Sequence, residues 1–188
     1  MAISRTLRDV FGALPVAPGA PLSPNETLAA VLLPVIDGVD PTIVFTKRTD
    51  ELPRHAGEIS FPGGLSHPED SFPLDTALRE TEEELGLSRE AVDVVGSLEP
   101  LRTFTTGFMI VPFIGVLEPE LEFTPNPREI AEVLEFPISR LMEVEREVNM
   151  SSDGATYFGF VYELDGRTIW GATARILHTL LERLQGSS

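Results

Sequence analysis

Residues 80 to 84 hold four glutamates within a segment that is otherwise patterned as an amphipathic helix. Glu80, Glu83 and Glu84 stand at positions i, i+3 and i+4, so their side chains share one helix face. Like charges at this spacing destabilise an isolated helix. We therefore expect positive charge against this face, and a hard divalent cation that prefers oxygen ligands, Mg²⁺ or Mn²⁺, fits best.

The acidic segment belongs to a helix predicted over residues 74–85, which Gly86 ends. Its core side carries apolar or small residues at helical spacing: Leu74, Leu78, Thr81 and Leu85. A short strand at residues 59–61 comes before the helix and ends in Pro62-Gly63-Gly64. A metal held by carboxylates beside a glycine turn is suited to phosphate chemistry.

The rest of the chain interleaves strands and helices without a regular βαβ period. Strands are predicted at residues 28–36, 42–46, 92–98 and 109–117, a hairpin at 157–164 and 167–170, and helices at 128–133, 138–143 and 172–184. This order predicts an α/β protein in which helices flank a mixed sheet. Residues 1–26 are rich in proline and form an expected arm with a short helix at 3–12, and residues 27–188 form one domain.

The composition excludes several classes of partner. The net charge is −16, from 30 acidic and 14 basic residues, which opposes binding of nucleic acid or an anionic membrane. No apolar run is long enough to span a bilayer, the N-terminus lacks a signal-peptide core, and there is no cysteine. We therefore expect a cytoplasmic protein, in which a metal and a few arginines neutralise an anionic small molecule.

The pattern Arg-Glu-x-x-Glu-Glu-x-Gly over residues 79–86, with Gly-Gly fifteen residues earlier, resembles the Nudix box. The resemblance implies a Nudix α/β/α sandwich with a mixed sheet and the box as loop–helix–loop. It also implies hydrolysis of a nucleoside diphosphate linked to another moiety. By position in the box, the resemblance makes Glu80, Glu83 and Glu84 the metal ligands.

Other residues of the box receive supporting roles. Arg79 lies one turn before Glu83 and can orient it through an i, i+4 ion pair. Gly63 and Gly64 let the backbone approach the metal or the phosphates, since no side chain obstructs it. Nudix enzymes often recruit a further glutamate from a late loop, and Glu129 is the candidate here. Glu83 and Glu129 both stay open as the group that accepts the proton of the attacking water.

The box departs from the general pattern in its loop. Asp70 follows Gly64 at the usual spacing of the loop acid, but the loop between Asp70 and Glu80 is one residue longer than usual. Asp70 is therefore not assigned as a ligand. Thr81 stands where the box has an apolar residue.

The segment before the box resembles the motif of the coenzyme A pyrophosphatase subgroup. The matching residues are Thr46, Arg48, Gly57, Phe61, Pro62, Gly63 and Gly64, and residues 169–175 are similar to that subgroup as well. The resemblance implies coenzyme A or a derivative as substrate, with Arg48 and Arg54 as phosphate-binding residues. The subgroup's second arginine falls on Pro53 here, so Arg54 has to replace it.

Two other functions remain alternatives. The first is a Nudix hydrolase for ADP-ribose, a dinucleotide or a nucleoside triphosphate, and the second is a non-catalytic nucleotide-binding module. The complete glutamate set argues against the second. Core packing is the expected role of Trp170, with stacking on adenine as the alternative. An exposed strand edge or the proline-rich arm could mediate a homodimer.

Overall fold

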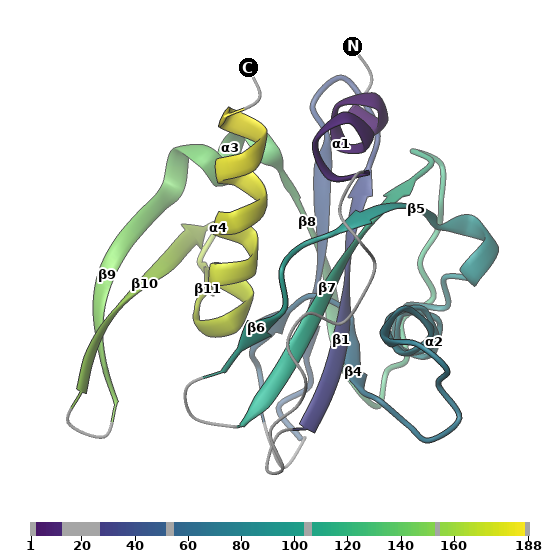
Figure 1. Cartoon of the computed structure of the whole chain (residues 1–188), viewed down its shortest axis with the longest axis horizontal. Helices are drawn as coiled ribbons and strands as arrows, with labels where there is room; N and C mark the ends of the chain where they lie inside the picture. The colour runs from purple at the N-terminus through teal and green to yellow at the C-terminus, as the bar shows by residue number, and fades with distance from the viewer. Residues whose placement is uncertain (1–2, 13–26, 52–54, 104–106, 153–154, 187–188) are drawn as a thin grey trace.

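A mixed β-sheet separates two hydrophobic cores in this computed structural model, which describes residues 3–12, 27–51, 55–103, 107–152 and 155–186 (Figure 1). The strands of this sheet are β1 (Thr27–Ile36), β2 (Thr42–Arg48), β3 (Ile59–Ser60), β4 (Gly63–Leu65), β5 (Asp93–Ser97), β6 (Leu101–Arg102), β7 (Phe108–Leu117) and β8 (Ile130–Pro137). β1 and β7 run parallel over their whole length, and the other pairings are antiparallel. The predicted mixed sheet is confirmed.

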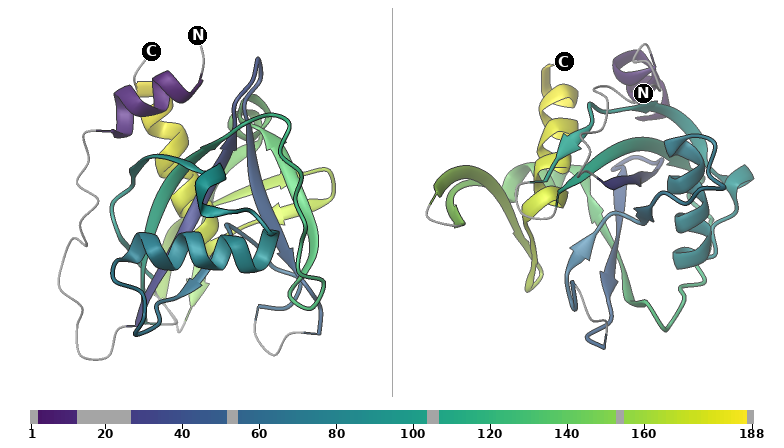
Figure 2. Two further views of the ribbon diagram at one scale, coloured as in Figure 1. Left: turned by 90° about the vertical axis from the view of Figure 1, so that its right-hand side faces the viewer. Right: turned by 60° about the horizontal axis from the view of Figure 1, so that its bottom comes forward.

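Alternate residues of β1 face opposite cores, as the two-residue period of a strand requires. Ala30 and Leu32 are fully buried in the core under α2 (Pro73–Leu85), while Leu33 and Val35 belong to the core on the other side of the sheet. Figure 2 shows α2 lying across the strands on its own face. The predicted order of layers, helix, sheet and helix, is therefore present.

The second core is covered by helices from both ends of the chain. α1 (Ile3–Phe11) buries Leu7 and Phe11 completely in this core, and α4 (Gly171–Gly186) adds the apolar face that its sequence predicts. The remaining elements on this side are α3 (Ile138–Val144) and a smaller antiparallel sheet of β9 (Glu145–Ser152), β10 (Ala155–Leu164) and β11 (Arg167–Ile169). The sequence predicted β10 and β11 but not β9.

The predicted helix at residues 128–133 is wrong. Residues 128–129 form a turn, and the rest of the segment belongs to β8, which pairs with β2 from Thr42 and Pro137 to Arg48 and Ile130. Ile130, Leu134 and Phe136 are buried, and the residues between them are more exposed, so the alternation of a strand prevails over the helical propensity of its glutamates. A short 3₁₀ helix at Arg89–Ala91 follows α2.

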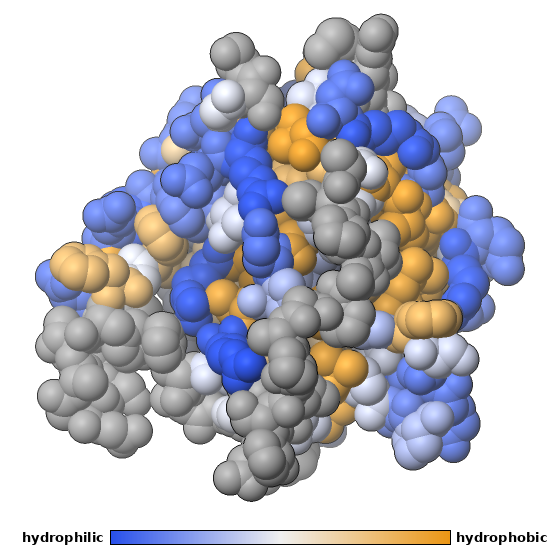
Figure 3. Space-filling view, in the orientation of Figure 1, coloured by the Kyte–Doolittle hydropathy of each residue, from blue (hydrophilic) through white to orange (hydrophobic). Residues whose placement is uncertain are grey.

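The surface separates polar from apolar residues in the usual way. Figure 3 shows hydrophilic residues along the right-hand edge and in a band left of the middle of this face, with hydrophobic residues between them. Within the described residues, no helix combines the length and the apolar character needed to cross a membrane.

Candidate active site

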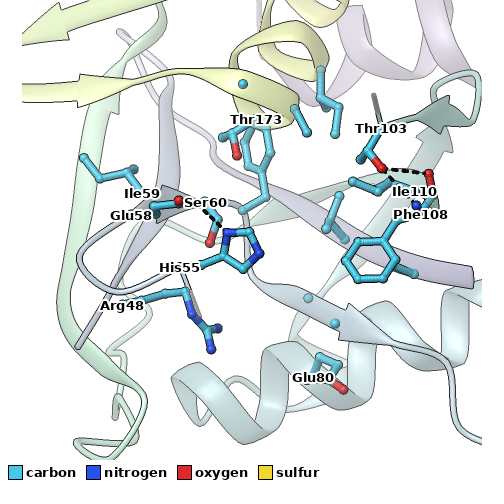
Figure 4. Close-up of a pocket in the computed structure, with 18 of the residues that line it drawn as sticks. Arg48, His55, Glu58, Ile59, Ser60, Glu80, Thr103, Phe108, Ile110 and Thr173 are labelled. Carbon is cyan, nitrogen blue, oxygen red and sulfur yellow. Dashed lines mark hydrogen bonds and ion pairs between the residues drawn. The ribbon is translucent and has the colours of Figure 1, made fainter. Parts of the chain in front are cut away.

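A cavity of about 820 Å³ opens among the glycine turn, α2, the loop between β2 and β3, and the start of α4 (Figure 4). One part of its lining is charged and includes Arg48, Glu80, Glu84 and Glu129. The other part is largely apolar and includes Val31, Ile59, Phe61, Phe108, Ile110, Trp170 and Ile176. A cavity with these two parts suits a ligand that joins an anionic group to a larger apolar or aromatic portion.

The two glycines of the turn bring the backbone against the carboxylates of α2. Gly63 and Gly64 lie in β4, which pairs with β1, so the turn is fixed to the central sheet. The backbone N–H of Gly63 donates to Oε2 of Glu84 at 3.2 Å. A Cβ on Gly64 would lie 2.5 Å from the carboxyl carbon of Glu80. A side chain at Gly64 would therefore collide with the Glu80 carboxylate, and glycine avoids this collision.

Glu84 is the most constrained carboxylate of the site. It is 3% exposed, and its partners are the N–H of Gly63 and the Arg48 guanidinium, with 3.7 Å between Nη1 and Oε1. Burial raises the pKa of Glu84 to about 8, and the nearby charges of Glu80 and Glu129 add to this shift. The positive charge of Arg48 alone therefore does not compensate for the burial of the Glu84 carboxylate.

Arg79 connects the loop of the box to the helix. Its guanidinium donates to both carboxylate oxygens of Asp70, at 3.2 and 3.0 Å, to Oε1 of Glu80 at 2.8 Å and to the carbonyl of Leu65 at 3.2 Å. These hydrogen bonds hold the pKa of Asp70 far below its usual range. The predicted contact of Arg79 with Glu83 is present at 3.4 Å, but the shorter contact is with Glu80.

The structure brings two of the three predicted metal ligands into the cavity. Glu80 and Glu84 line it, whereas the Glu83 side chain is 58% exposed and lies outside the lining. Among the residues that the structure describes, no three acidic or histidine side chains converge into a preformed metal cage. The shared helix face therefore holds for Glu80 and Glu84, and Glu83 lies at its solvent edge.

The donor chemistry of the site nevertheless fits a divalent cation. Its side-chain oxygens are carboxylates, which are the ligands that Mg²⁺ and Mn²⁺ prefer. The buried carboxylate of Glu84 stands near Glu80 and Glu129, and one guanidinium at 3.7 Å incompletely balances its charge. A bound dication would offset this repulsion, so Glu80, Glu83 and Glu84 stay the proposed ligands.

Glu129 reaches the cavity from the turn that precedes β8. Its carboxylate accepts a hydrogen bond from the Asn126 side-chain amide at 3.3 Å, and its carbonyl accepts from the N–H of Thr49 at 2.9 Å. The second bond attaches the turn to the end of β2, next to Arg48. Glu129 is therefore placed on the Glu84 side of the cavity, as a late-loop glutamate should be.

The end of β2 and the loop that follows it supply basic groups to the same cavity. Arg48 lines it, and within the described ranges its buried Nε has no hydrogen-bond partner. Arg54 and Pro53 lie outside the described residues. His55 and Glu58, whose Nδ1 and Oε2 are 2.8 Å apart, also line the cavity.

The expectation that Trp170 packs in the core is wrong. Trp170 is 47% exposed and lines the cavity, immediately after β11. Ile169, the last residue of β11, is 1% exposed in the core, and strand alternation sends the next side chain to the opposite side. The apolar residue Ile169, directly before Trp170, is the sequence signal that could have predicted that the Trp170 side chain points away from the core.

Sequence comparisons identify relatives over most of the chain. The model of the NUDIX domain matches residues 26–154. A protein called uncharacterized Nudix hydrolase NudL from Photorhabdus laumondii subsp. laumondii is 38% identical over 166 residues, which cover 87% of this chain and 88% of that protein. Its namesake from Yersinia enterocolitica is 35% identical over 169 residues, covering 89% of this chain and 86% of that protein.

Solved structures share the fold at low sequence identity. The MutT protein of Methanosarcina mazei Go1 aligns with a TM-score of 0.55 and 14% identity, over 88% of this chain and 97% of that chain. The NUDIX domain of Shewanella oneidensis NrtR, solved in complex with ADP ribose, aligns with a TM-score of 0.55 and 12% identity, over 86% and 87% of the two chains. These likenesses agree with the α/β fold described above.

Proposed function

The chain belongs to the Nudix hydrolase family, and we propose on that premise that it cleaves the diphosphate bond of coenzyme A or a coenzyme A derivative. The family's members are hydrolases that act on acid anhydrides, and this chain is one of them. The proposed products are 3′,5′-ADP and 4′-phosphopantetheine, or its acylated form. The proposed reaction thus consumes one water and breaks one phosphorus–oxygen bond of the diphosphate.

One observation carries this choice of substrate: Arg48 and Trp170 line the same cavity as Glu80 and Glu84. A guanidinium can bind phosphate oxygens through two parallel hydrogen bonds, and an exposed indole can stack on adenine. The motif residue Phe61 holds the start of the glycine turn in place. Its ring stacks on that of Phe45, with 4.8 Å between the ring centroids.

The carboxylates of α2 define the reacting end of the cavity. A divalent cation such as Mg²⁺ or Mn²⁺, held by Glu80, Glu83 and Glu84, would neutralise the diphosphate and activate the attacking water. Arg79 holds the Glu80 carboxylate in position through a hydrogen bond, so this proposed ligand is already oriented before the substrate binds.

Protein groups also bind the phosphate and accept the proton. Arg48 binds a phosphate oxygen from the end of β2, beside Glu84. Glu129 or Glu83 takes the proton from the attacking water, and we favour Glu129 because it lines the cavity. The nucleophilic oxygen forms a new bond to one phosphorus while the other phosphate leaves.

A substrate panel tests this proposal. Purified protein with Mg²⁺ or Mn²⁺ is incubated with coenzyme A, acyl derivatives, ADP-ribose, NADH and nucleotides, and mass spectrometry identifies the products. Coenzyme A should be cleaved with a kcat/KM at least about tenfold above the others, which corresponds to roughly 1.4 kcal/mol of transition-state preference. Preferred cleavage of ADP-ribose or a nucleotide would assign the chain to the alternative substrates, and binding without cleavage would make it a non-catalytic module.

Substitutions in the helix then test the site. Glu83→Gln and Glu84→Gln should each lower kcat by roughly two to four orders of magnitude, because each removes a negative ligand but keeps the size of the side chain. Glu82→Gln is the matched control, since Glu82 is exposed on the same helix and lies outside the cavity lining. Near-normal turnover by Glu84→Gln would contradict the assignment.

A further inference from the structure

We propose that Arg48 and a divalent cation compete for the negative charge of Glu84, so that cation binding releases Arg48 to the substrate's phosphate. Arg48 then does more than bind substrate: it couples the binding of metal and substrate, which become mutually strengthening. The competition for Glu84 is independent of the substrate, and only the release to phosphate rests on the proposed function.

The geometry of the Arg48–Glu84 pair is that of a weakly held cation. Nη1 and Oε1 are 3.7 Å apart, beyond the length of a hydrogen bond, and the buried Nε of Arg48 has no acceptor within the described part of the chain. A guanidinium fork that could donate in parallel to one carboxylate therefore makes only an electrostatic contact here. As far as the described residues go, Arg48 can leave Glu84 without breaking a hydrogen bond of its side chain.

The backbone around Arg48 is fixed, so its side chain is what can move. The Arg48 N–H donates to the Glu58 carbonyl at 3.0 Å, and the N–H of Thr49 donates to the Glu129 carbonyl at 2.9 Å. These bonds tie the end of β2 to two loops that line the cavity. The side chain of Arg48 remains 25% exposed, whereas that of Glu84 is 4% exposed, so the arginine is the solvent-accessible partner.

Charge around Glu84 explains why a dication should win this competition. Glu84 is repelled by the charges of Glu80 and Glu129, and Arg48 contributes a single positive charge near Glu84. A dication attracts this group about twice as strongly as a monovalent cation at the same distance. Once the dication neutralises the carboxylates, Arg48 has lost its counter-ion and faces the cavity where an anionic ligand binds.

Calorimetric titration with Mg²⁺ alone tests the first step. Arg48→Gln should bind Mg²⁺ roughly three- to thirtyfold more tightly than the wild type, because removing a nearby positive charge makes the site more negative. A proton competes for the same carboxylates, but a dication gains about twice as much as a proton from the lost arginine charge, so the direction of the change is preserved.

Titration with ADP as a phosphate probe tests the second step. In the wild type, saturating Mg²⁺ should raise the affinity for ADP, and ADP should raise the affinity for Mg²⁺ by the same factor, because binding free energies are linked reciprocally. After correction for Mg²⁺ bound by ADP itself, Arg48→Gln should lower that factor by roughly fivefold or more. Arg48→Gln thus changes the two affinities in opposite directions.

Two variants control for charge and for folding. Arg89→Gln removes the same charge from an exposed ion pair with Asp75 outside the cavity and should leave Mg²⁺ affinity within about twofold. Arg48→Lys keeps the charge but loses the fork, so its Mg²⁺ affinity should stay near that of the wild type while ADP binds more weakly. It also provides a test if Arg48→Gln fails to fold.

The proposal is overturned if Arg48→Gln binds Mg²⁺ no more tightly than Arg89→Gln does, or if the coupling between Mg²⁺ and ADP survives in Arg48→Gln. If Arg48→Gln does not fold, unchanged ADP binding by Arg48→Lys overturns it. A protein that shows this coupling but does not cleave coenzyme A would contradict the proposed substrate and leave the role of Arg48 intact.

Discussion

Arg79 holds Asp70 through two hydrogen bonds, from Nε to Oδ1 at 3.2 Å and from Nη2 to Oδ2 at 3.0 Å. The Asp70 side chain is 7% exposed, and it also accepts from the hydroxyl of Thr76 at 2.8 Å. The remaining guanidinium nitrogen of Arg79 donates to Glu80. A chain of contacts therefore runs from the loop of the box, through one arginine, to a carboxylate that faces the cavity.

Asp70→Asn should reduce both stability and activity. The amide cannot accept on both sides, so the free energy of unfolding should fall by about 2–3 kcal/mol, as for a buried charged hydrogen-bond partner. The kcat should fall by roughly tenfold, because Arg79 no longer holds Glu80 in place. Urea unfolding and steady-state kinetics measure the two effects.

The control for this prediction is Asp165→Asn. Asp165 accepts two hydrogen bonds from Arg140 at 3.2 Å, but both side chains are about half exposed, so the loss of its charge should lower the free energy of unfolding by less than about 1 kcal/mol.

The low pKa of Asp70 also predicts how its contribution to stability depends on pH. Its stabilisation is present above the pKa of about 3.8 expected for an unfolded chain and is lost as the pH falls further, so wild type and Asp70→Asn should converge in acid.

Glu84→Gln should be more stable than the wild type at alkaline pH when no divalent cation is added. The pKa of Glu84 rises from 4.5 to about 8 on folding, so the folded protein holds this proton more tightly than the unfolded chain. The resulting stabilisation is complete below about pH 4.5, declines as the pH rises, and is gone above about pH 8. The difference between Glu84→Gln and wild type should therefore grow over this range, by on the order of 2–4 kcal/mol.

Added Mg²⁺ provides the internal control for that measurement. A bound cation lowers the proton affinity of nearby carboxylates, so saturating Mg²⁺ should flatten the pH dependence of the wild type and leave Glu84→Gln less affected. Equal pH profiles of the two proteins without Mg²⁺ would show that Glu84 titrates normally in the folded state.

The two glycines of the turn should respond differently to alanine. Gly63 has φ of 149°, and a Cβ there would lie 2.3 Å from the Ala30 carbonyl, so Gly63→Ala should lose at least about 3 kcal/mol of stability. The three heavy atoms nearest to a Cβ on Gly64 all belong to the Glu80 carboxyl group, the nearest at 2.5 Å, so a side-chain end rather than backbone would have to shift. Gly64→Ala should therefore fold nearly normally, with kcat lowered roughly tenfold to a hundredfold. Thermal denaturation and kinetics distinguish these cases, and equal loss of stability in both variants would contradict the distinction.

Sequence patterns predicted the layers of the fold because burial is periodic along its main elements. β1 alternates between two cores, and α2 buries Leu78, Thr81 and Leu85 as its spacing requires. The prediction failed at β8, where Glu129, Glu132 and Glu135 are spaced three residues apart and imitate a polar helix face. Its strand structure depends on pairing with β2, which is distant in sequence and leaves no local signal.

The site was predictable in its parts more than in its geometry. The spacing of Glu80, Glu83 and Glu84 indicates a shared face, but the depth of each carboxylate depends on the glycine turn that packs against it. Burial of Glu84 and exposure of Glu83 therefore follow from tertiary contacts. The role of Asp70 was missed for the same reason, since its partner Arg79 approaches only when the loop folds back on the helix.

His55→Gly should weaken substrate binding without unfolding the protein. His55 has φ of 56°, a left-handed conformation that glycine adopts without strain. The substitution relieves strain in the folded state but gives the unfolded chain more freedom, so the free energy of unfolding should change by less than about 1 kcal/mol. Its ring lines the cavity, and Glu58 orients it through the contact between Nδ1 and Oε2 at 2.8 Å. Loss of this oriented ring should raise KM roughly three- to thirtyfold, with less change in kcat.

The second non-glycine residue with a left-handed conformation in the chain's described part supplies the matched control. Asp165 has φ of 52° and lies in the turn between β10 and β11, outside the cavity lining. Asp165→Gly relaxes the backbone in the same way and should leave KM unchanged, which separates a backbone effect from the loss of an imidazole. His55→Asn, which tolerates the same conformation and keeps a side chain that can both donate and accept hydrogen bonds, should restore part of the lost affinity. If His55→Gly and Asp165→Gly have the same KM, His55 is a turn residue without a role in binding.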